Sequence, residues 1–343
     1  MTETGGKWPF FSIVIATYNS EGTLGYTLES IREQTIDKDE IEVLVVDGGS
    51  TDGTRAMAEK AGETVLDNPK RLPEYAKAVG TEYAHGRFIV RMDSDEEFSY
   101  PEQMQDKKDL LEKHPEVKML ISNRYVPGRK EICGISANYM NILGDPFSYF
   151  VYRTKKDKIH TYGQNIIGKE DRGVIMRFRQ GDIFPLADSA TCALDLDYMR
   201  EKYPEEYATI GFICRAYDQV LIDSELCAVI PGDDIKHNCR SSFRTYLNKL
   251  KFRVINNLFH QEESGYSVKE SISGKLRRRK YLFGLYALLV PLPVLDSVRL
   301  AAVYRDPTYL LHFVYVYYVC FQVFRLGVVR LAGGTRRNGS YGG

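Results

Sequence analysis

The sequence predicts an α/β fold, in which a mostly parallel sheet is covered by helices and a helical region follows at the C-terminal end. Continuous apolar runs alternate with amphipathic stretches over about the first 125 residues, which is typical of parallel strands joined by helices. After residue 235 the composition changes to basic stretches and long apolar stretches. We therefore expect two domains, at residues 1–235 and 236–343.

The expected strands and helices follow one another closely. The apolar run at 10–17 predicts a buried strand, and Leu24, Leu28 and Ile31 then recur at the spacing of one helical face. Further strands are expected at 41–47, near 65–66, at 87–92 and at 117–122, and further helices at 52–62, 73–84 and 101–114. Residues 123–190 show no long period, and we expect loops and short elements there.

The net charge of zero hides a strong asymmetry along the chain. Residues 236–343 hold 18 Lys and Arg against 5 Asp and Glu, so the first part is acidic. This pattern indicates that the basic part meets an anionic surface such as lipid head groups. The six cysteines lack C-x-x-C spacing, which favours reduced thiols in a protein that faces the cytosol. The first ten residues do not resemble a signal peptide.

Four acidic residues crowd the end of the strand expected at 87–92: Asp93, Asp95, Glu96 and Glu97. Such a cluster is either a solvated turn or a cation site. In an extended chain Asp93 and Asp95 would face one cleft, because alternate side chains point the same way. Two carboxylates with coordination positions left open suit Mg²⁺ or Mn²⁺ that also holds a diphosphate. Asp47 and Asp93 both follow strands, at the edge where ligands bind in such sheets.

Three stretches taken together, SIVIATYNSEGTLGYTLESI, EVLVVDGGSTDGT and RFIVRMDSDEEF, resemble the family-two glycosyltransferases of the GT-A fold. The resemblance implies a nucleotide-sugar donor and assigns one role to each of these residues: a nucleoside pocket lined by Thr17, Tyr18, Asn19 and Asp47, a loop shaped by Ser50 and Asp52, a ribose or sugar contact at Asp93, and a metal ligand at Asp95. Without these motifs, Asp47 and the glycines after it would suggest a plain strand-to-helix turn.

One departure from the family pattern concerns the helix expected at 73–84. This chain has AKAVG where family members often have ARN-x-G, so Lys77 replaces an arginine. Lys77 can still meet a phosphate as a point charge, but it lacks the planar fork of a guanidinium.

The catalytic base is expected in the segment GFICRAYDQVLIDSEL, at 211–226. Inverting transfer needs a carboxylate that takes the proton of the acceptor, and the resemblance places Asp218 in that role, with Tyr217 where a glutamate is usual. The alternative is that Asp218 is an acid favoured by the helix dipole. Asp188 is the second candidate base, and its alternative role is that of a turn acid.

His237 ends the segment CAVIPGDDIKH, which resembles the strand-then-histidine ending of the family. It is a candidate third metal ligand beside Asp93 and Asp95, or a contact of the diphosphate. The alternative is a structural histidine. Asp233 and Asp234 are expected to be turn residues.

The basic C-terminal region contains three stretches of interest. Residues 240–259 predict a helix with an apolar stripe and basic flanks, which suits either a bilayer interface or packing on the first domain. The apolar run at 281–295 is short for a membrane span and is interrupted by two prolines, whereas 308–324 reaches the lower limit for spanning. We expect a re-entrant or interfacial hairpin, and a true span remains an alternative.

These observations predict a metal-dependent, inverting glycosyltransferase at the cytoplasmic face of the cell membrane, with UDP as the expected nucleotide and a lipid-linked acceptor. The acceptor is expected to be a polyprenyl phosphate or a lipid-linked oligosaccharide. Two alternatives are a nucleotidyltransferase, whose usual basic Gly-rich loop is missing here, and a catalytically silent membrane-associated scaffold. A nucleic-acid binder is not expected, because the basic residues accompany long apolar runs.

Overall fold

The computed structural model describes residues 8–186, 192–259 and 274–333, and the chain divides into two compact units. Unit 1 contains the described residues up to 128 together with 162–179 and 185–238. Unit 2 contains 129–161, 180–184 and the described residues from 239 onward. The middle segment 129–161 thus packs within unit 2, although the sequence division placed it in the first domain. The roles given to the two domains stay predictions.

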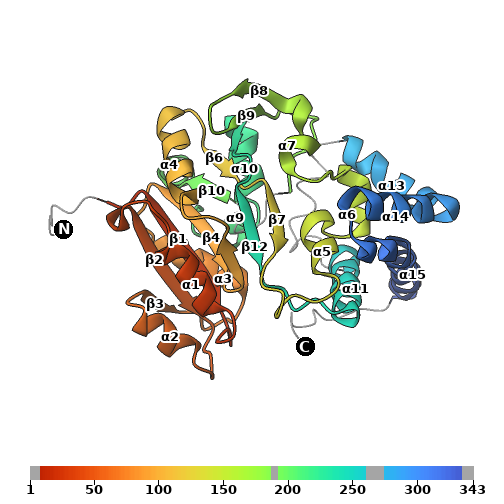
Figure 1. Cartoon of the computed structure of the whole chain (residues 1–343), viewed down its shortest axis with the longest axis horizontal. Helices are drawn as coiled ribbons and strands as arrows, with labels where there is room; N and C mark the ends of the chain where they lie inside the picture. Colours follow the sequence, from red (N-terminus) through yellow and green to blue (C-terminus); the bar gives the residue numbers. More distant parts are fainter. Residues whose placement is uncertain (1–7, 187–191, 260–273, 334–343) are drawn as a thin grey trace. The chain divides into compact units, whose positions relative to one another are not determined.

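Unit 1 is built on a nine-stranded sheet of the described residues, in the order β3-β2-β1-β4-β10-β6-β11-β9-β8 (Figure 1). Its strands are β1 (Phe11–Thr17), β2 (Ile41–Asp47), β3 (Thr64–Asp67), β4 (Phe88–Asp93), β6 (Met119–Ile121), β8 (Ile166–Lys169), β9 (Val174–Arg177), β10 (Cys192–Asp195) and β11 (Leu226–Val229). The four strands β3, β2, β1 and β4 are parallel, and they are the apolar runs that the sequence predicted. β10 runs antiparallel to both of its neighbours.

The helices of unit 1 are α1 (Leu24–Arg32), α2 (Thr54–Lys60), α3 (Pro73–Tyr83), α4 (Gln103–Lys113), α8 (Leu196–Lys202), α9 (Ile210–Ile213) and α10 (Ala216–Ser224), with 3₁₀ turns η1 (Lys38–Glu40) and η2 (Gly163–Asn165). Among them, α1, α2, α3 and α4 lie between the strands as the sequence predicted. α1 buries Leu24, Leu28 and Ile31, the residues that marked its apolar face. α3 packs closely on β1. The approach is so close that a Cβ at Gly80 would collide with the side chain of Val14.

A second, three-stranded sheet positions the acid cluster of unit 1. It consists of β5 (Glu96–Phe98), β12 (Asp234–His237) and β7 (Arg124–Pro127), in the order β5-β12-β7. The antiparallel pairing of β5 with β12 places His237 opposite Glu96.

Asp233 and Asp234, which the sequence predicted to be turn residues, lie where the chain enters β12. Asp233 closes the turn, with its N–H donating to the carbonyl of Ile230 at 3.1 Å, and Asp234 is the first residue of β12. Asp233 is fully buried, where it pairs with Lys107 and accepts a hydrogen bond from Gln103. Asp234 pairs with Arg124 at 2.9 Å. Both acids therefore anchor β12 through partners that are distant in the sequence.

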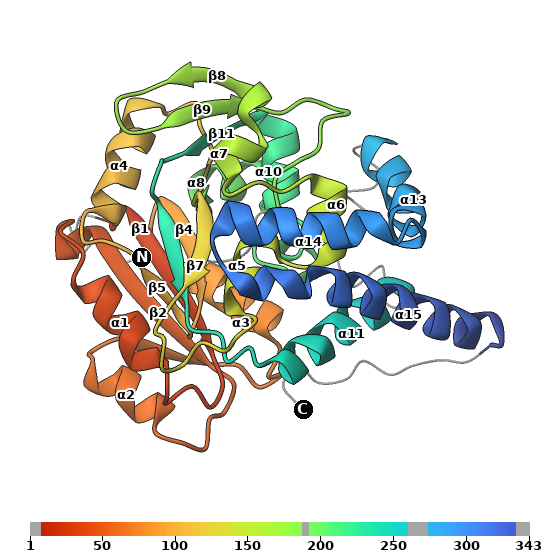
Figure 2. The ribbon, with the colours of Figure 1, turned by 45° about the vertical axis from the view of Figure 1, so that its right-hand side comes forward.

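Unit 2 is helical. Its elements are α5 (Ala137–Leu143), α6 (Pro146–Tyr152), α7 (Lys158–Thr161), α11 (Phe243–Phe259), α13 (Gly274–Leu288), α14 (Pro291–Tyr304), η4 (Pro307–Leu311) and α15 (His312–Leu331). Pro291 begins α14 rather than merely breaking a helix, and α13 and α14 meet at 97°. α15 packs on α11 and on α14 (Figure 2).

The core of unit 2 is rich in tyrosine, which accounts for part of the high count of 24. His312 is fully buried; its Nδ1 lies 2.5 Å from the hydroxyl of Tyr139, and its Nε2 lies 3.0 Å from the hydroxyl of Tyr286. The same Tyr286 hydroxyl donates to Asp296 at 3.0 Å. A polar network therefore joins α5, α13, α14 and α15.

Candidate active site

Three neighbouring parallel strands end at the same edge of the large sheet. In the register of the sheet Thr17 pairs with Asp47, and Ala16 pairs with Asp93. The last residues of β1, β2 and β4 therefore lie side by side. This is the edge at which the sequence predicted a site, because ligands of open α/β sheets bind beyond the carboxyl ends of the strands.

Asp47 organises the loop that follows β2. It is 2% exposed, and its Oδ1 accepts from the Thr17 hydroxyl at 3.2 Å and from the Ser50 hydroxyl at 2.5 Å. Its Oδ2 accepts from the backbone N–H groups of Gly49 and Ser50 at 3.2 and 3.0 Å. Each carboxylate oxygen thus has two donors, which uses its acceptor capacity. Asp47 fixes the shape of the loop. To accept a hydrogen bond from the nucleobase of a donor, Asp47 would have to give up one of these four hydrogen bonds.

Side chains from the loops after β1 and β2 join the two loops. The N–H of Asn19 donates to Ser50 Oγ at 2.8 Å, and Asn19 Oδ1 accepts from the N–H of Thr51 at 2.9 Å. Asp52 accepts from the N–H of Glu21 at 3.2 Å. Asn19 adopts the left-handed conformation with φ 50°, which asparagine tolerates better than most residues. The predicted donor-binding residues of the two loops therefore form one connected structure.

Arg71 lies beside this structure and was missed by the sequence analysis. Its guanidinium is 5.4 Å from the ring centre of Tyr18, which is itself 47% exposed, and one of its nitrogens lies near Gly49. Arg71 has φ 56°, and its N–H donates to the carbonyl of Asn68. The signal in the sequence was a basic residue between β3 and the proline that begins α3.

Lys77 pairs with Asp93 at 3.0 Å. Burial alone would lower the pKa of Lys77, but the nearby charge of Asp93 outweighs it and holds the pKa above its usual value. Lys77 is therefore charged, and it neutralises the carboxylate at the end of β4. Its predicted contact with a phosphate would be made from this ion pair.

The acid cluster does not adopt the extended conformation that the sequence analysis assumed. β4 ends at Asp93, the chain turns at Ser94 and Asp95, and β5 begins at Glu96. The expectation was wrong because β5 leaves the large sheet to pair with β12. Asp93 and Asp95 consequently have different partners.

Glu96 is a buried part of the cluster, 2% exposed. It accepts from the N–H of Asp93 and from the hydroxyl of Tyr125, both at 2.7 Å. Burial, followed by the charges of Asp93 and Asp95, raises the pKa of Glu96 well above its usual range. The neutral form of Glu96 is therefore favoured, which reduces its repulsion of Asp93 and Asp95.

Asp95 and His237 form the part of the site that could hold a metal. Asp95 Oδ2 lies 3.4 Å from His237 Nε2, and the carbonyl of Asp95 accepts from the N–H of Asn238 at 2.7 Å. Within the described residues, no group of three or more His, Cys, Asp or Glu side chains is arranged as a metal site. One carboxylate and one imidazole fit a divalent ion whose other ligands are diphosphate oxygens and water.

The first turn of α10 carries Asp218, which is 6% exposed, and the partly buried Tyr217. Burial raises the pKa of Tyr217 to about 12, so its hydroxyl keeps its proton. α10 packs on β10 and β6, and β10 is the neighbour of β4 in the sheet. The role of Asp218 as base stays a prediction, and Asp188 lies outside the described residues.

Arg91 was also missed by the sequence analysis. It lies two residues before Asp93 on β4, so both side chains leave the same face of the strand. Arg91 is 1% exposed, and its guanidinium lies 5.7 Å from the ring centre of Tyr217. The signal was a single charged residue inside an apolar strand. The structure thus adds a second cation to the neighbourhood of Lys77 and Tyr217.

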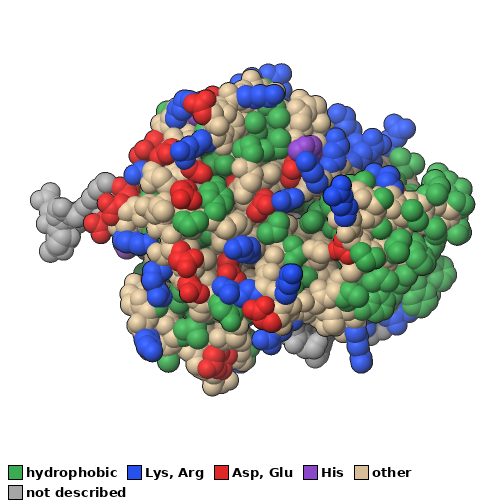
Figure 3. Space-filling view, in the orientation of Figure 1, with side chains coloured by type: hydrophobic (Ala, Val, Ile, Leu, Met, Phe, Trp, Pro, Cys, Tyr) green, Lys and Arg blue, Asp and Glu red, His purple; other side chains and the backbone are tan. Residues whose placement is uncertain are grey.

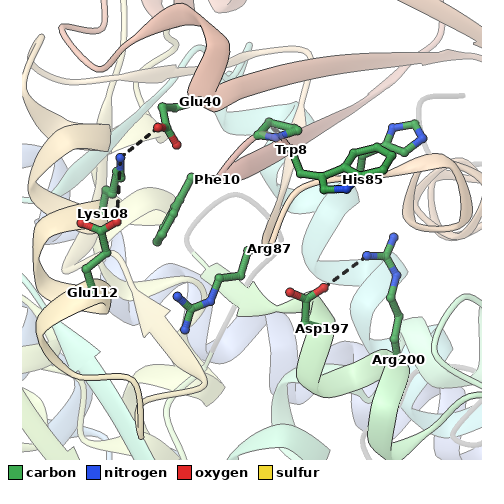
Figure 4. Close-up of a pocket in the computed structure, with 10 residues that line it drawn as sticks. Trp8, Phe10, Glu40, His85, Arg87, Lys108, Glu112, Asp197 and Arg200 are labelled. Atoms are coloured by element: carbon green, nitrogen blue, oxygen red, sulfur yellow. Dashed lines mark hydrogen bonds and ion pairs between the residues drawn. The ribbon is translucent and has the colours of Figure 1, made fainter. Parts of the chain in front are cut away.

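A pocket of about 510 Å³ lies at the opposite edge of the sheet, before the amino ends of β1 and β4 (Figure 4). Trp8 stacks on His85 there with ring centres 5.0 Å apart. The charges around the pocket pair with one another, as between Lys108 and Glu40 at 3.2 Å and between Arg200 and Asp197 at 3.4 Å. None of the predicted site residues lines this pocket.

Comparison with known proteins places the sequence motifs in a family. Residues 12–131 match Glycosyl transferase family 2. This part of the chain belongs to glycosyltransferase family 2. The resemblance that the sequence motifs carried is therefore confirmed over the residues that contain β1, β2 and β4.

Curated relatives of this family 2 domain include TarS of Staphylococcus aureus, a poly(ribitol-phosphate) beta-N-acetylglucosaminyltransferase, with 32% identity over 125 residues, 35% of this chain and 22% of TarS. GgaA of Bacillus subtilis, a minor teichoic acid biosynthesis protein, is 32% identical over 130 residues, 35% of this chain and 29% of GgaA. The chain therefore spans less than a third of the length of these relatives.

The fold is that of the GT-A glycosyltransferases, as predicted. The mannosyltransferase PcManGT of Pyrobaculum calidifontis, solved with GDP-Man and Mn²⁺, superposes with a TM-score of 0.50. The superposition covers 93% of this chain and 88% of PcManGT, at 13% sequence identity. At this identity the likeness concerns the fold alone.

Proposed function

We propose that this chain is an inverting, metal-dependent glycosyltransferase that moves a sugar from a nucleotide diphosphate donor to a lipid-linked acceptor. The observation that carries the proposal is the alignment of Thr17, Asp47 and Asp93 at the ends of three neighbouring strands, next to the Asp95–His237 pair. This edge combines a rigid loop for a nucleoside with acids that can hold a cation. The membership of residues 12–131 in family 2 supports the same reaction class.

The donor is proposed to be a UDP-sugar. The joined loops after β1 and β2 would hold the nucleoside, with the exposed ring of Tyr18 and the guanidinium of Arg71 at its edge. The relative TarS is by its name an N-acetylglucosaminyltransferase, which supports a nucleotide-activated sugar of that kind.

The metal is proposed to be Mn²⁺ or Mg²⁺, bound by Asp95 and His237 with Asp93 nearby. When bound, such an ion offsets the negative charge on the departing diphosphate. Lys77 holds Asp93 in place as an ion pair, and the raised pKa of Glu96 favours its neutral form beside the other acids. These side chains reduce the repulsion among the acids of the site.

Asp218 is proposed as the base that takes the proton from the acceptor hydroxyl. Its place in the first turn of α10 lets the helix dipole stabilise the carboxylate. Asp188 remains the second candidate for this role.

The acceptor is proposed to be lipid-linked, a polyprenyl phosphate or a lipid-linked oligosaccharide, at the cytoplasmic face of the cell membrane. The basic and apolar composition of unit 2 supports a lipid substrate. None of the six cysteines, all of which lie among the described residues, forms a disulfide.

The experiment that tests this proposal is a calorimetric titration of the full chain with UDP, with and without Mn²⁺. We expect binding that requires the metal, and we expect Asp95→Ala to abolish it. Asp197→Ala, an acid at the opposite edge of the sheet, should bind like the unmodified chain. Metal-independent binding, or no binding, would contradict the proposal; the silent scaffold predicts the latter. A screen of UDP-sugars for release of UDP rather than pyrophosphate separates sugar transfer from nucleotidyl transfer.

A further inference from the structure

Unit 2 exposes an apolar surface of unusual extent, which we call the helix corner: residues 281–295, at the junction of α13 and α14. Every exposed side chain in this range is apolar or aromatic. Tyr281 is 75% exposed, Leu288 79% and Leu295 63%. Hydrophobic side chains gather over this end of the molecule in Figure 3.

Such a surface is unfavourable in water. Apolar surface exposed to water costs about 25 cal/mol per Å², and soluble monomers rarely expose large contiguous apolar patches. The exposed large hydrophobic side chains of unit 1 are scattered singly, as at Ile167 and Tyr83, whereas those of unit 2 are consecutive along the chain. The helix corner is therefore a surface that another phase or molecule covers.

The charges beside the corner point to a lipid surface. Lys275, Arg277 and Arg278 are exposed at the start of α13, and no Asp or Glu occurs from 274 to 295. The first acid after the corner, Asp296, pairs with Arg299 at 3.0 Å. Two copies meeting at this surface would bring these cations together, whereas anionic lipid phosphates would neutralise them.

The geometry fits one leaflet. The apolar part of α13, from Tyr281 to Leu288, is about 12 Å long at 1.5 Å per residue. The hydrocarbon core of a bilayer is about 30 Å thick, so this arm reaches roughly through one leaflet. The 97° bend at the corner then turns the chain along the membrane plane. We propose that unit 2 is a monotopic membrane anchor, whose helix corner inserts into one leaflet of an anionic bilayer.

α15 extends the same anchor without crossing the membrane. The segment Pro307–Leu331 is long and apolar enough to span a membrane, and only 33% of its apolar 18-residue stretch is buried. However, α15 packs along α11, where Arg253 pairs with Asp145 at 2.9 Å. A spanning α15 would take that ion pair towards the hydrocarbon, which is costly. We place α15 in the interface, with the exposed Phe321 and Phe324 in contact with lipid.

The test is flotation of the full chain with vesicles of phosphatidylcholine, with and without phosphatidylglycerol. We expect the chain to float with the anionic vesicles, and the double variant Leu288→Glu/Val290→Glu to lose at least tenfold in partitioning. Both side chains are mostly exposed, so these changes leave the packing of unit 2 intact. Ile167→Glu is the matched control, an exposed apolar residue of unit 1 that should leave flotation unchanged. Arg277→Glu/Arg278→Glu should remove the preference for phosphatidylglycerol.

Three outcomes would overturn the proposal. The chain could fail to float, or the Leu288→Glu/Val290→Glu variant could float as well as the unmodified chain. Alternatively, the chain could form a dimer that this variant dissociates while no vesicle binding is seen, which would make a second copy the occupant. Retained UDP binding by the variant keeps this test separate from the proposed transferase function.

The in-plane placement of α15 has its own test. The variant Leu331→Cys, bound to preformed vesicles, is treated from outside with a membrane-impermeant thiol reagent. We expect labelling at position 331 and at Cys214, the exposed cysteine of unit 1. Protection of position 331 while Cys214 is labelled would show that α15 spans.

Discussion

Units 1 and 2 bury different kinds of core. The sheet of unit 1 is filled by aliphatic side chains such as Ile13 and Ile15, and its polar site residues lie at the strand ends. The core of unit 2 is rich in tyrosine, and it contains the hydrogen bonds of His312 with Tyr139 and Tyr286. The comparison teaches that the polar groups at the strand ends of unit 1 serve the proposed chemistry, whereas the buried polar groups around His312 in unit 2 serve the packing of helices. Substitutions should separate the two roles.

The largest effect is expected from Asp218→Asn. Loss of a general base lowers turnover by about 10²–10⁴-fold, while UDP binding and the unfolding temperature stay unchanged. Steady-state rates, calorimetry and thermal unfolding measure the three quantities. Unchanged turnover would remove Asp218 from its role and move attention to Asp188.

The core of unit 2 should be sensitive to pH. Burial lowers the pKa of His312 from its ordinary value of 6.5 to about 4, so the unfolded chain binds the proton more readily in this interval. The stabilisation is complete above pH 6.5 and is lost as the pH falls towards 4, by about 3 kcal/mol. Denaturant unfolding followed by tyrosine fluorescence measures it. His312→Gln should flatten this part of the pH dependence; an identical pH profile in the variant would contradict the assignment.

The stability of unit 1 should be sensitive to side-chain volume in its core. Gly80→Ala puts a methyl group against Val14, which we expect to lower the free energy of unfolding by about 1–3 kcal/mol at every pH between 4 and 8. Gly62→Ala is a weaker control with open space around the new methyl group but a positive φ of 84°. Equal losses for the two variants would show that backbone conformation, rather than contact with β1, determines the result.

The smallest effect on stability is expected at Arg91. Burial of the Arg91 guanidinium carries a desolvation cost, so Arg91→Met should leave the free energy of unfolding within about 1 kcal/mol or raise it. If Arg91 serves the site rather than the fold, transfer activity falls in the same variant. Chemical denaturation and rate measurements on one preparation decide the point. A large loss of stability would show that Arg91 has a structural role, as the polar groups of unit 2 do.

The sequence predicted unit 1 well, because the period of its apolar residues is a local signal. The strands at Phe11–Thr17 and Ile41–Asp47 and the strand-end acids follow from consecutive residues and their resemblance to family 2. The conformation of the acid cluster was not predictable in this way. β5 turns away to pair with β12, more than a hundred residues later in the chain.

The surroundings of two residues that the sequence analysis named also depend on distant partners. Glu96 is buried and has a raised pKa because Tyr125 and the neighbouring acids surround it, and Asp233 is an anchor because Lys107 reaches it from α4. Unit 2 includes α5 and α6 from the middle segment, where short aromatic-rich stretches gave no period. The pattern in one stretch of sequence indicates which of its residues are buried. It does not indicate against which other stretch of the chain those residues pack.

The interleaving of the two units limits how the chain can be divided. A fragment ending at residue 235 would keep α6 but lose α13 and α15, on which α6 packs. Tyr149, buried in the intact unit, would then be stripped of its neighbours, and the fragment would be prone to aggregate. Unit 2 is therefore no detachable tail, because three separate stretches of the chain build it: 129–161, 180–184 and the described residues from 239 onward. A recombination event that exchanged unit 2 between relatives would have to move all three stretches at once.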